Sequence, residues 1–508
     1  MTSTTTATPL SPQNLAAIAG RLPVPSYDRA SLTPGIVHLG VGGFHRAHQA
    51  MYLDRLMEAG LALDWGVRGI GVLPHDARMK QVMDAQGGLY TLVLKHPDGS
   101  REARVVGSVL DFTLAPEDPE RAVEVMTDPR IRVVSLTVTE GGYNIDAVTG
   151  EFLLDTPEVT ADLAGGPART SFGLITEALR RRRERGLRPF TVMSCDNVQG
   201  NGHVARRAFT AFARAKDPEL GAWVEENVRF PNSMVDRITP GTTDADRAEV
   251  RERYGVEDAW PVVCEPFAQW VLEDDFVDGR PPLEQAGVQV VEDVEPYELM
   301  KLRLLNAGHQ GLCYFAHLAG YRLVHEAAQD PLFARFLLGY MEREGTPTLP
   351  PVPGIDLDEY RHELIRRFSN GEVRDTVARL CAESSDRIPK WLLPVVRHQL
   401  ASGGEVHRSA AVVASWARYA EGVDEQGEPI EVVDRLAERL TATAQRNRAE
   451  PTAFLADRSL FGDLVDDERF VAEYTAALAS LHEHGARATL EALVARDDAG
   501  GGDTGTGA

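Results

Sequence analysis

Residues 35–60 read GIVHLGVGGFHRAHQAMYLDRLMEAG, and this stretch decides the fold of the first half of the chain. An apolar run leads into three glycines, and a helical pattern follows from Arg46 to Gly60. Small residues between a strand and a helix let a pyrophosphate approach backbone N–H groups at the helix start. The stretch therefore predicts a dinucleotide-binding turn. Its expected cofactor-binding residues are Gly40, Val41, Gly42, Gly43, Phe44, His45 and Arg46.

The glycine pattern departs from the usual GxGxxG fingerprint, because His45 stands at the third glycine position. A tight turn without a ligand is the alternative interpretation. His45 and His48 lie three residues apart, as two metal ligands can, but no third ligand is evident nearby. We therefore expect no metal.

Strand and helix patterns alternate through the rest of the first half. YTLVLKH and ARVVGSVLDF are expected to pair around the turn at residues 97–99. The alternation predicts an α/β fold with a mostly parallel, doubly wound sheet. The other strand-like runs are WGVRGIGVL (65–73), IRVVSLTVTE (131–140) and FTVMSCDN (190–197). The run RRRRER (180–185) ends a helix and is predicted to be a solvated helix end, where cations suit the macrodipole, rather than an anion site.

The pattern changes near residue 296, where successive amphipathic helices begin. We predict a Rossmann-like dinucleotide-binding domain over 1–295 and a mainly α-helical substrate and catalytic domain over 296–496. Residues 1–13 and 497–508 are expected to be disordered tails, given their small polar composition. Residues 218–295 are mixed in pattern and could belong to either domain or form a hinge.

Composition limits the possible partners and compartments. The net charge of −23 argues against nucleic acid, since phosphate binding needs a basic surface. No apolar run approaches the ~20 residues that span a bilayer, and the first residues lack a secretion signal. The four cysteines are widely separated and are expected to be buried, reduced thiols. These features favour a cytoplasmic protein.

A second informative stretch, ELMKLRLLNAGH (298–309), places polar residues in an apolar helical pattern. On a regular helix with Lys301 at 0° about the axis, Glu298 lies at about 60°, His309 at about 80° and Asn306 at about 140°. Polar groups on a partly buried side need partners. Satisfied core residues are one interpretation of this pattern, and a catalytic site is the other.

Lysine is rare in this chain, which has five Lys and 48 Arg. Desolvation would lower the pKa of a buried Lys301, so that its amine could act as a general base, which arginine cannot do. Combined with a nucleotide-binding turn, this indicates oxidation of an alcohol. Lys301 would take the hydroxyl proton, Asn306 would donate to the oxygen, and His309 would orient the substrate.

Several further stretches resemble the mannitol dehydrogenase family, the polyol-specific long-chain dehydrogenases. The resemblance covers roughly residues 12–490. The stretches that carry it, besides the Lys301–His309 helix, are GVGGFHRAHQA, TEGGYNID (139–146), FTVMSCDN (190–197), FPNSMVDRITP (230–240) and AWPVVCEPFAQWVLED (259–274).

The resemblance implies a role for each matching residue. Lys301 would be the general acid/base of a metal-independent enzyme, and Asn197 would join Asn306 in stabilising the oxyanion. His309 would bind the polyol, and Glu298 would gate the proton path to water. The implied hydroxyl-binding residues are Asp236, Arg379 and Arg387. Without the resemblance, Asp236 and Arg379 would be interpreted as surface ion pairs. Close relatives carry Lys at the position of Arg387, which could alter the preferred polyol.

Asp76 is expected to select the cofactor. It follows the strand-like run 65–73, where an acidic residue binds the adenosine ribose and repels a 2′-phosphate. The nearby Arg78 weakens this inference from the sequence alone, and a merely acidic loop is the alternative. The resemblance aligns Asp76 with the family's cofactor-selecting acid, so NAD is the expected cofactor.

The resemblance also implies a substrate class. A small-molecule polyol and its ketose are expected, with D-mannitol and D-fructose as the pair, in a monomeric enzyme. The same family includes arabinitol dehydrogenases and reductases of fructuronate or tagaturonate. A catalytically inactive NAD-binding protein and a zinc dehydrogenase are alternatives from other classes.

Overall fold

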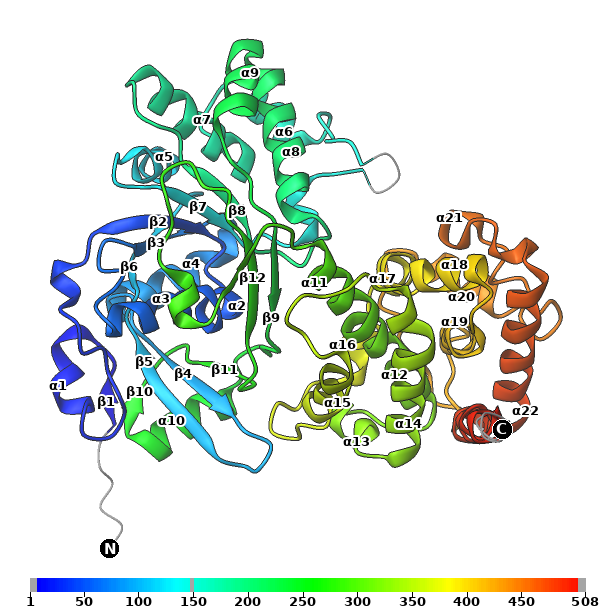
Figure 1. Cartoon of the computed structure of the whole chain (residues 1–508). Helices are drawn as coiled ribbons and strands as arrows, with labels where there is room; N and C mark the ends of the chain where they lie inside the picture. Colours follow the sequence, from blue (N-terminus) through cyan, green and yellow to red (C-terminus); the bar gives the residue numbers. More distant parts are fainter. Residues whose placement is uncertain (1–6, 147–149, 501–508) are drawn as a thin grey trace, which may run out of the picture. The chain divides into compact units, whose positions relative to one another are not determined.

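The computed structural model describes residues 7–146 and 150–500, and its chain divides into two compact units, Met1–Glu295 and Pro296–Ala508 (Figure 1). The prediction of a disordered tail over residues 1–13 is wrong for residues 8–10. Strand β1 (Thr8–Pro9) pairs with β10 (Val256–Glu257), and Leu10 is buried. At the other end, helix α22 (Glu468–Gly500) continues through residues 497–500. Residues 1–6 and 501–508 lie outside the described part.

Unit 1 is built on a five-stranded sheet in which all neighbouring strands are parallel. Its order in space is β6 (Val109–Leu114), β3 (Gly66–Gly71), β2 (Pro34–Leu39), β7 (Val133–Leu136), β8 (Thr191–Ser194). The chain adds strands on one side of β2 and then crosses to the other. The carboxyl ends of β2 and β7 therefore form the switch point where such sheets bind ligands.

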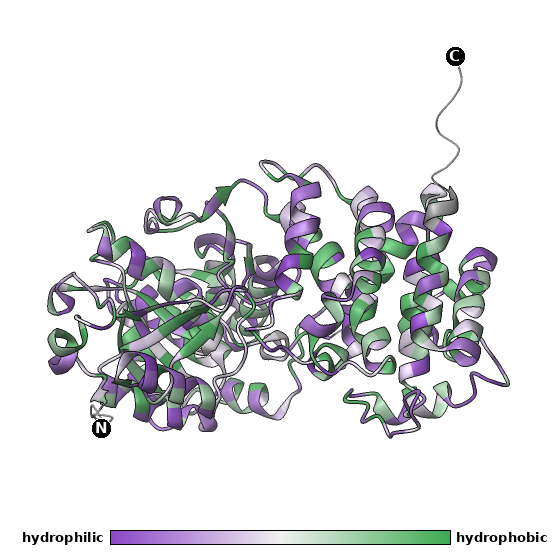
Figure 2. Ribbon diagram, turned by 90° about the horizontal axis from the view of Figure 1, so that it is seen from below, coloured by the Kyte–Doolittle hydropathy of each residue, from purple (hydrophilic) through white to green (hydrophobic). Residues whose placement is uncertain are grey.

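Helices cover both faces of this sheet (Figure 1). Neighbouring residues of β2 point to opposite faces, so Ile36 and Val37 belong to two different buried clusters. One cluster includes residues of α3 (Gln49–Glu58), and the other includes residues of α5 (Pro119–Thr127), α7 (Ser171–Glu184) and α8 (Asn201–Lys216). Figure 2 shows the apolar residues gathered on the strands and on the inner sides of the helices. The predicted Rossmann-like α/β class is confirmed.

Two predicted elements differ from the structure. ARVVGSVLDF forms two strands, because the chain turns at residues 107–108. β5 (Arg101–Val106) pairs antiparallel with β4 (Tyr90–Lys95), as expected, whereas β6 joins the parallel sheet. The helix expected over residues 46–60 is broken at His48, whose φ of −123° and ψ of −91° separate α2 (Gly43–Ala47) from α3.

The mixed segment 218–295 belongs to unit 1 rather than to unit 2 or a hinge. It supplies strands to three smaller sheets, of order β13-β12-β9, β11-β4-β5 and β1-β10. Its elements are α9 (Pro218–Asn227), β9 (Ser233–Asp236), α10 (Asp244–Tyr254), β10, β11 (Val262–Cys264), β12 (Gln269–Glu273) and β13 (Gln289–Val291).

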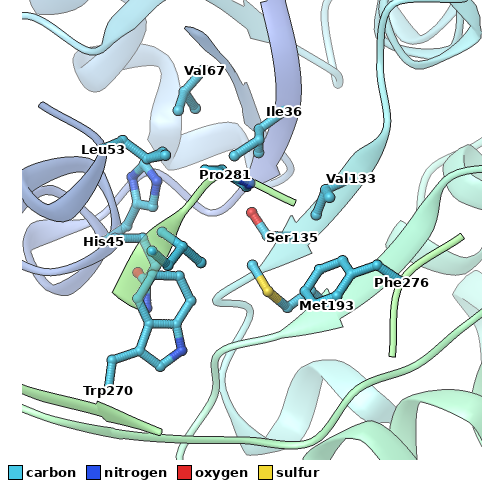
Figure 3. Close-up of a pocket in the computed structure, with 12 residues that line it drawn as sticks. Ile36, His45, Leu53, Val67, Val133, Ser135, Met193, Trp270, Phe276 and Pro281 are labelled. Carbon is cyan, nitrogen blue, oxygen red and sulfur yellow. The ribbon is translucent and has the colours of Figure 1, made fainter. Parts of the chain in front are cut away.

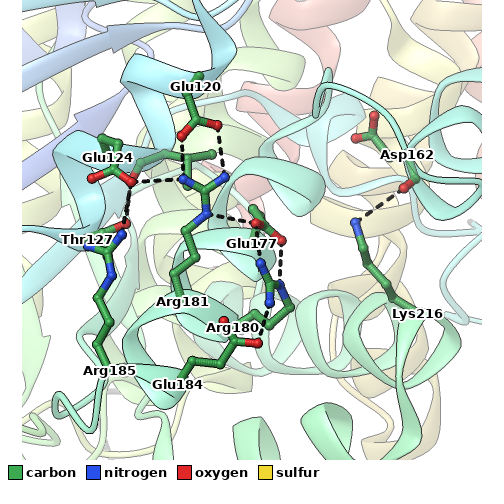
Figure 4. A network of polar contacts seen from close by, with 11 residues as sticks. Glu120, Glu124, Thr127, Asp162, Glu177, Arg180, Arg181, Glu184, Arg185 and Lys216 are labelled. Carbon is green, nitrogen blue, oxygen red and sulfur yellow. Dashed lines mark hydrogen bonds and ion pairs between the residues drawn. The ribbon is translucent and has the colours of Figure 1, made fainter.

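The arginine run at the end of α7 is only partly a solvated helix end. Arg182 is 3% exposed and donates to the carbonyls of Met126, Asp128 and Arg188. Figure 4 shows that Arg181 joins α7 to α5 through ion pairs. The prediction of solvated arginines is therefore wrong for Arg182, because a guanidinium carries enough donors to bind several carbonyls at once while it is buried.

Unit 2 is helical, as predicted. Helix α12 (Ala307–Leu318) lies at its centre, where every residue except His317 is buried, and it packs against α13, α14, α16, α19 and α22. The surrounding helices are α13 (Val324–Ala328), α14 (Pro331–Tyr340), α15 (Leu357–Phe368), α16 (Val377–Cys381), α17 (Ser384–Trp391), α18 (Leu393–Ser402), α19 (His407–Tyr419), α20 (Ala437–Ala444), α21 (Arg458–Phe461) and α22.

Within residues 7–146 and 150–500, no helix has the length and apolar character needed to cross a bilayer. The four cysteines, Cys195, Cys264, Cys313 and Cys381, are free and buried, as expected.

Candidate active site

The glycine turn lies at the switch point of the large sheet. Gly40 has a φ of +91°, and a Cβ there would collide with the carbonyl oxygen of Thr137 in the segment after β7. Only glycine fits this position without strain. The turn then leads through Gly42 into α2 at Gly43. The strand, the turn and the helix thus match the arrangement predicted for a dinucleotide site.

The side chains of His45 and Arg46 anchor this turn inside the protein. The His45 ring stacks on His38 at 3.6 Å, and burial holds its pKa well below the usual value. Arg46 donates to the carbonyl of Trp260 at 2.5 Å, and burial lowers its pKa to about 10. Because both side chains are buried, we expect contacts with a cofactor to come from the backbone of the turn.

His48 is not arranged as a metal ligand beside His45. Its Nε2 lies 2.8 Å from the carbonyl of Gln269, so this nitrogen carries the proton. Its Nδ1 lies 3.0 Å from the amide nitrogen of Gln49 and accepts from it. Both ring nitrogens therefore have protein partners, which argues against a role for this pair in metal binding.

Asp76 follows β3 in the chain. β3 lies beside β2 in the parallel sheet, and β2 leads into the glycine turn. One carboxylate oxygen accepts from the backbone N–H of Leu73 at 2.9 Å. A Cβ at Gly71 would lie 2.7 Å from the Asp76 Cβ, so this glycine allows the acid to sit against the end of the strand. Arg78, which weakened the inference of NAD, lies over the ring of Trp260 at 4.8 Å.

Two further predicted residues of unit 1 lie at strand ends. Asn197 follows β8 by three residues and is exposed. Asp236 ends β9, pairs in register with Gln269 of β12, and is 5% exposed. The interpretation of Asp236 as a surface ion pair is therefore wrong.

A small cavity lies behind the glycine turn on the α3 side of the sheet. Figure 3 shows His45 and Ser135 among the apolar residues that line it, such as Ile36, Val67 and Trp270. Its volume of about 10 Å³ corresponds to one water position. This cavity is too small for a dinucleotide and belongs to the interior of unit 1.

The polar set of unit 2 is buried and lies on an irregular helix. Glu298, Lys301, Asn306 and His309 are each at most 9% exposed. Residues Lys301–Asn306 form a π-helix between α11 (Glu295–Met300) and α12. The regular spacing of about 100° per residue is therefore wrong across this stretch. π-turns are rare and occur frequently at functional sites.

The π-helix brings Lys301 and Asn306 closer to one face than a regular helix would. A regular helix would separate residues five apart by about 140°. A π-turn closes i→i+5 hydrogen bonds, so residues five apart lie roughly one above the other. The ring of His309 lies 4.4 Å from that of Phe368 on α15, which fixes the imidazole from one side.

The two predicted arginines of unit 2 have protein partners. Arg379 forms a forked ion pair with Asp375, whose hydrogen bonds raise the pKa of the guanidinium. Its side chain is 54% exposed, as the surface ion-pair interpretation expected. Arg387 donates to the carbonyls of Arg379 and Leu380 at 3.1 Å and lies over the ring of Trp391.

One group in the described part of unit 2 has the residue types of a metal site. Donor atoms of Glu344, Glu405 and His407 lie within 4.8 Å of one another. The Glu344 carboxylate, however, accepts from the backbone N–H groups of Arg408 and Ser409 at the start of α19. The Arg408 guanidinium also pairs with Glu405. We interpret this group as a buried helix cap.

Sequence reasoning missed several residues that support the site. Asp196, beside Asn197, accepts from the backbone of Val138 and Thr139. His38 holds the glycine turn from β2. The residues lie within the quoted stretches, but only the fold shows that Asp196 and Thr139 meet, because β7 and β8 are distant in sequence and adjacent in space.

Unit 1 has a Rossmann sheet with a glycine turn and an acid after β3, and unit 2 carries the buried Lys, Asn and His set. Together these features define a nicotinamide-dependent alcohol dehydrogenase. Residues 34–285 match the mannitol dehydrogenase Rossmann domain, and residues 293–482 match the mannitol dehydrogenase C-terminal domain. The chain belongs to the mannitol dehydrogenase family and is an NAD-dependent polyol dehydrogenase.

Individual relatives agree with this assignment. A mannitol 2-dehydrogenase of Phaeosphaeria nodorum is 46% identical over 95% of this chain and 85% of its own. The Pseudomonas fluorescens mannitol 2-dehydrogenase, solved as a ternary complex with NAD and D-mannitol, is 44% identical with a TM-score of 0.88, over 96% of this chain and 100% of its own. A substrate-free D-sorbitol dehydrogenase is 38% identical with a TM-score of 0.87, over 95% of this chain and 100% of its own.

Proposed function

We propose that this protein catalyses the reversible, NAD-dependent oxidation of D-mannitol to D-fructose. The observation that carries the proposal is the buried Lys301 at the start of a π-helix that ends at the buried Asn306, with the buried His309 three residues further on. The relative solved with NAD and D-mannitol supports the choice of substrate. Unit 1 would bind the cofactor, and unit 2 would supply the acid/base group.

The glycine turn fits NAD, because a Cβ built at Gly42 or Gly43 would meet no atom closer than 3.7 Å, which leaves the backbone at the start of α2 open, and Asp76 follows the next strand. NAD, when bound, supplies the acceptor for the hydride that leaves the alcohol carbon. The Lys301 amine takes the hydroxyl proton as the carbonyl forms, and Asn197 and Asn306 donate to the developing oxyanion. His309 orients the hydroxyl, and Glu298 passes the proton from Lys301 towards water. In the reverse direction Lys301 returns the proton.

Substrate hydroxyls would be bound by Asp236, Arg379 and Arg387. The contacts of the two arginines favour a neutral polyol over a uronate. Arg379 is already paired with Asp375, and Arg387 with two carbonyls. The carboxylate of a uronate would have to displace these partners in order to pair with either guanidinium. The carboxylate of Asp76 would favour NAD over NADP by repelling a 2′-phosphate.

A substrate panel tests the assignment. Reduction of fructose, fructuronate, tagaturonate and xylulose is measured with NADH and with NADPH, and oxidation of D-mannitol and D-sorbitol with NAD. The highest kcat/KM is expected for fructose with NADH, and for mannitol in the other direction. A large preference for a uronate or for xylulose would reject the mannitol assignment. Loss of activity in EDTA would instead indicate a zinc dehydrogenase.

We also propose a monomeric, cytoplasmic protein. The net charge of −23 opposes self-association, and four free, buried cysteines suit a reducing compartment. Light scattering after size-exclusion chromatography would give the mass, and a value near twice the 55.6 kDa of the chain would reject the monomer.

A further inference from the structure

The segment after β7 connects the glycine turn to the end of β8. Its first residue, Thr137, donates from its hydroxyl to the carbonyl of Gly40 at 2.7 Å. The same hydroxyl accepts from Nε2 of His38 at 2.9 Å, because its own proton is committed to Gly40. Burial lowers the pKa of His38 to about 3, so this ring is neutral and donates from one nitrogen only. The beginning of the segment is thus fixed to the cofactor turn.

Two residues later the backbone is strained. Thr139 has a φ of +67° and a ψ of 168°, a region that is essentially restricted to glycine. Its N–H donates to Oδ1 of Asp196 at 2.8 Å, and the N–H of Val138 donates to Oδ2 at 3.2 Å. Strained backbone of this kind persists only where its surroundings enforce it, and it clusters at active sites. Here the Asp196 carboxylate accepts from two successive N–H groups of the turn, those of Val138 and Thr139.

The carboxylate, the N–H and the carbonyl of Asp196 each have further hydrogen-bond partners. The hydroxyl of Tyr143 donates to Oδ2 of Asp196 at 2.7 Å and lies 2.5 Å from the hydroxyl of Ser194, which therefore donates to it. The Asp196 N–H donates to Ser194, and the side-chain amide of Asn201 donates to the Asp196 carbonyl at 3.0 Å. This closed ring fixes the backbone immediately before Asn197. Asp196 is 7% exposed, so most of its surface is shielded from water.

We propose that Asp196 is a positioning residue that clamps the strained Thr139 turn and thereby orients Asn197 relative to the glycine turn. A continuous path runs from Gly40 through Thr137 and Thr139 to the carboxylate of Asp196. The inference rests on the proposed role of Asn197 as an oxyanion donor. It assigns the TEGGYNID stretch a role in setting the distance between the cofactor turn and that donor.

The test compares Asp196→Asn with Asp162→Asn. An amide at 196 places an NH₂ group opposite a backbone N–H or the Tyr143 hydroxyl, so part of the clamp is lost without a change in size. Asp162 is the matched control, because this buried carboxylate of unit 1 also accepts from two backbone N–H groups and one hydroxyl, of Arg169 and Thr170. kcat with the best wild-type substrate and the Kd for NADH are measured for both.

We expect Asp196→Asn to lower kcat at least about tenfold while the Kd for NADH changes less than about threefold. Asp162→Asn should leave both constants within about threefold of the wild type. Amide hydrogen exchange of residues 137–144 should accelerate only in Asp196→Asn, because the N–H group of either Val138 or Thr139 then faces an NH₂ group and loses its acceptor.

A second substitution separates clamping from a general structural role. Glycine adopts the backbone of Thr139 without strain, whereas alanine does not. Thr139→Gly added to Asp196→Asn should restore kcat by about fivefold or more, and Thr139→Ala should restore none of it. A structural defect unrelated to the turn would not distinguish these two double variants.

Three results would overturn the inference: a kcat of Asp196→Asn within threefold of the wild type, an equal loss in Asp162→Asn, or equal rescue by Gly and Ala at 139. Hydrogen exchange needs no substrate, so it separates this inference from the proposed function. If the substrate panel rejects mannitol, unchanged exchange in Asp196→Asn would still reject the clamp, and faster exchange would support it.

Discussion

Lys301 is the residue on which the chemistry depends. Lys301→Ala removes the amine and should lower kcat by about 10²–10⁴-fold, the usual contribution of a general acid/base. NADH should still bind, since the glycine turn and Asp76 belong to unit 1. Stopped-flow or steady-state turnover and NADH fluorescence measure the two effects. Lys216→Ala, at the end of α8, is the control and should retain full turnover.

Turnover of Lys301→Ala at the wild-type rate would show that another group takes the proton. Parallel loss of NADH binding would show instead that Lys301 supports the cofactor site.

Asp76 is expected to set the choice of cofactor. Asp76→Asn removes the charge that repels a 2′-phosphate, so the ratio of kcat/KM for NADH over NADPH should fall about tenfold or more. Asn keeps an oxygen that can accept from the N–H of Leu73, so the turn should remain intact. Asp84→Asn, on the exposed side of α4 (Ala77–Gln86), should leave the ratio unchanged. An unchanged ratio in Asp76→Asn would assign cofactor selection to another residue.

At the scale of elements, three successive arginines near the end of α7, Arg181, Arg182 and Arg183, lie in different surroundings. Arg182→Met should destabilise unit 1 most, by about 3 kcal/mol, because three carbonyls, of which that of Met126 is buried, lose their donor. Arg181→Met should cost about 1 kcal/mol through its ion pairs to Glu120 and Glu124. Arg183→Met should change stability by less than about 0.5 kcal/mol.

Urea unfolding would measure this order, and catalysis should be unaffected in all three variants, since α7 carries none of the proposed active-site residues. A larger cost for Arg183→Met than for Arg182→Met would contradict the burial of Arg182.

The elements also show which parts of the site were predictable. The strand, the glycine turn and the helix could be predicted from the sequence, because each depends on local backbone preference, such as the positive φ of Gly40. The break at His48 was not, because it follows from partners distant in sequence, among them Gln269. The π-helix at Lys301–Asn306 was also missed, since the apolar pattern was interpreted with the spacing of a regular helix. The sequence therefore predicted the residues of the set, but not the geometry of the helix that carries them.

At the scale of the whole molecule, the alternation of strands and helices predicted the parallel sheet, and the change of pattern near 296 coincides with the division between the two units. The sequence could not show which unit residues 218–295 belong to. Their strands pair with β4 and with each other, and such contacts have no local signature in the sequence. The same limit hid the meeting of Thr139 with Asp196.

The stability of the fold towards acid should depend on its buried histidines. Burial lowers the pKa of His38 from 6.5 to about 3, and the pKa of His45 is lowered in the same direction. Below pH 6.5 the unfolded chain takes up protons that the folded chain does not, so stability falls as the pH decreases from 6.5 towards 3. For His38 alone, the free energy of unfolding should decrease by about 2 kcal/mol between pH 7.5 and pH 5.

His38→Gln removes this titration and should make the pH dependence shallower by that amount, even though the variant is less stable at pH 7.5 through lost bonds to Ser135 and Thr137. Urea unfolding at pH 5.0, 6.0 and 7.5 measures the slope, and the range stays above the usual carboxyl pKa values. His484→Gln is the control, because this side chain is 63% exposed and should leave the slope unchanged. Parallel curves for His38→Gln and the wild type would show that His38 is not kept neutral in the folded protein. The ring could then donate from both nitrogens, and Nδ1 would donate to the hydroxyl of Ser135 instead of accepting from it.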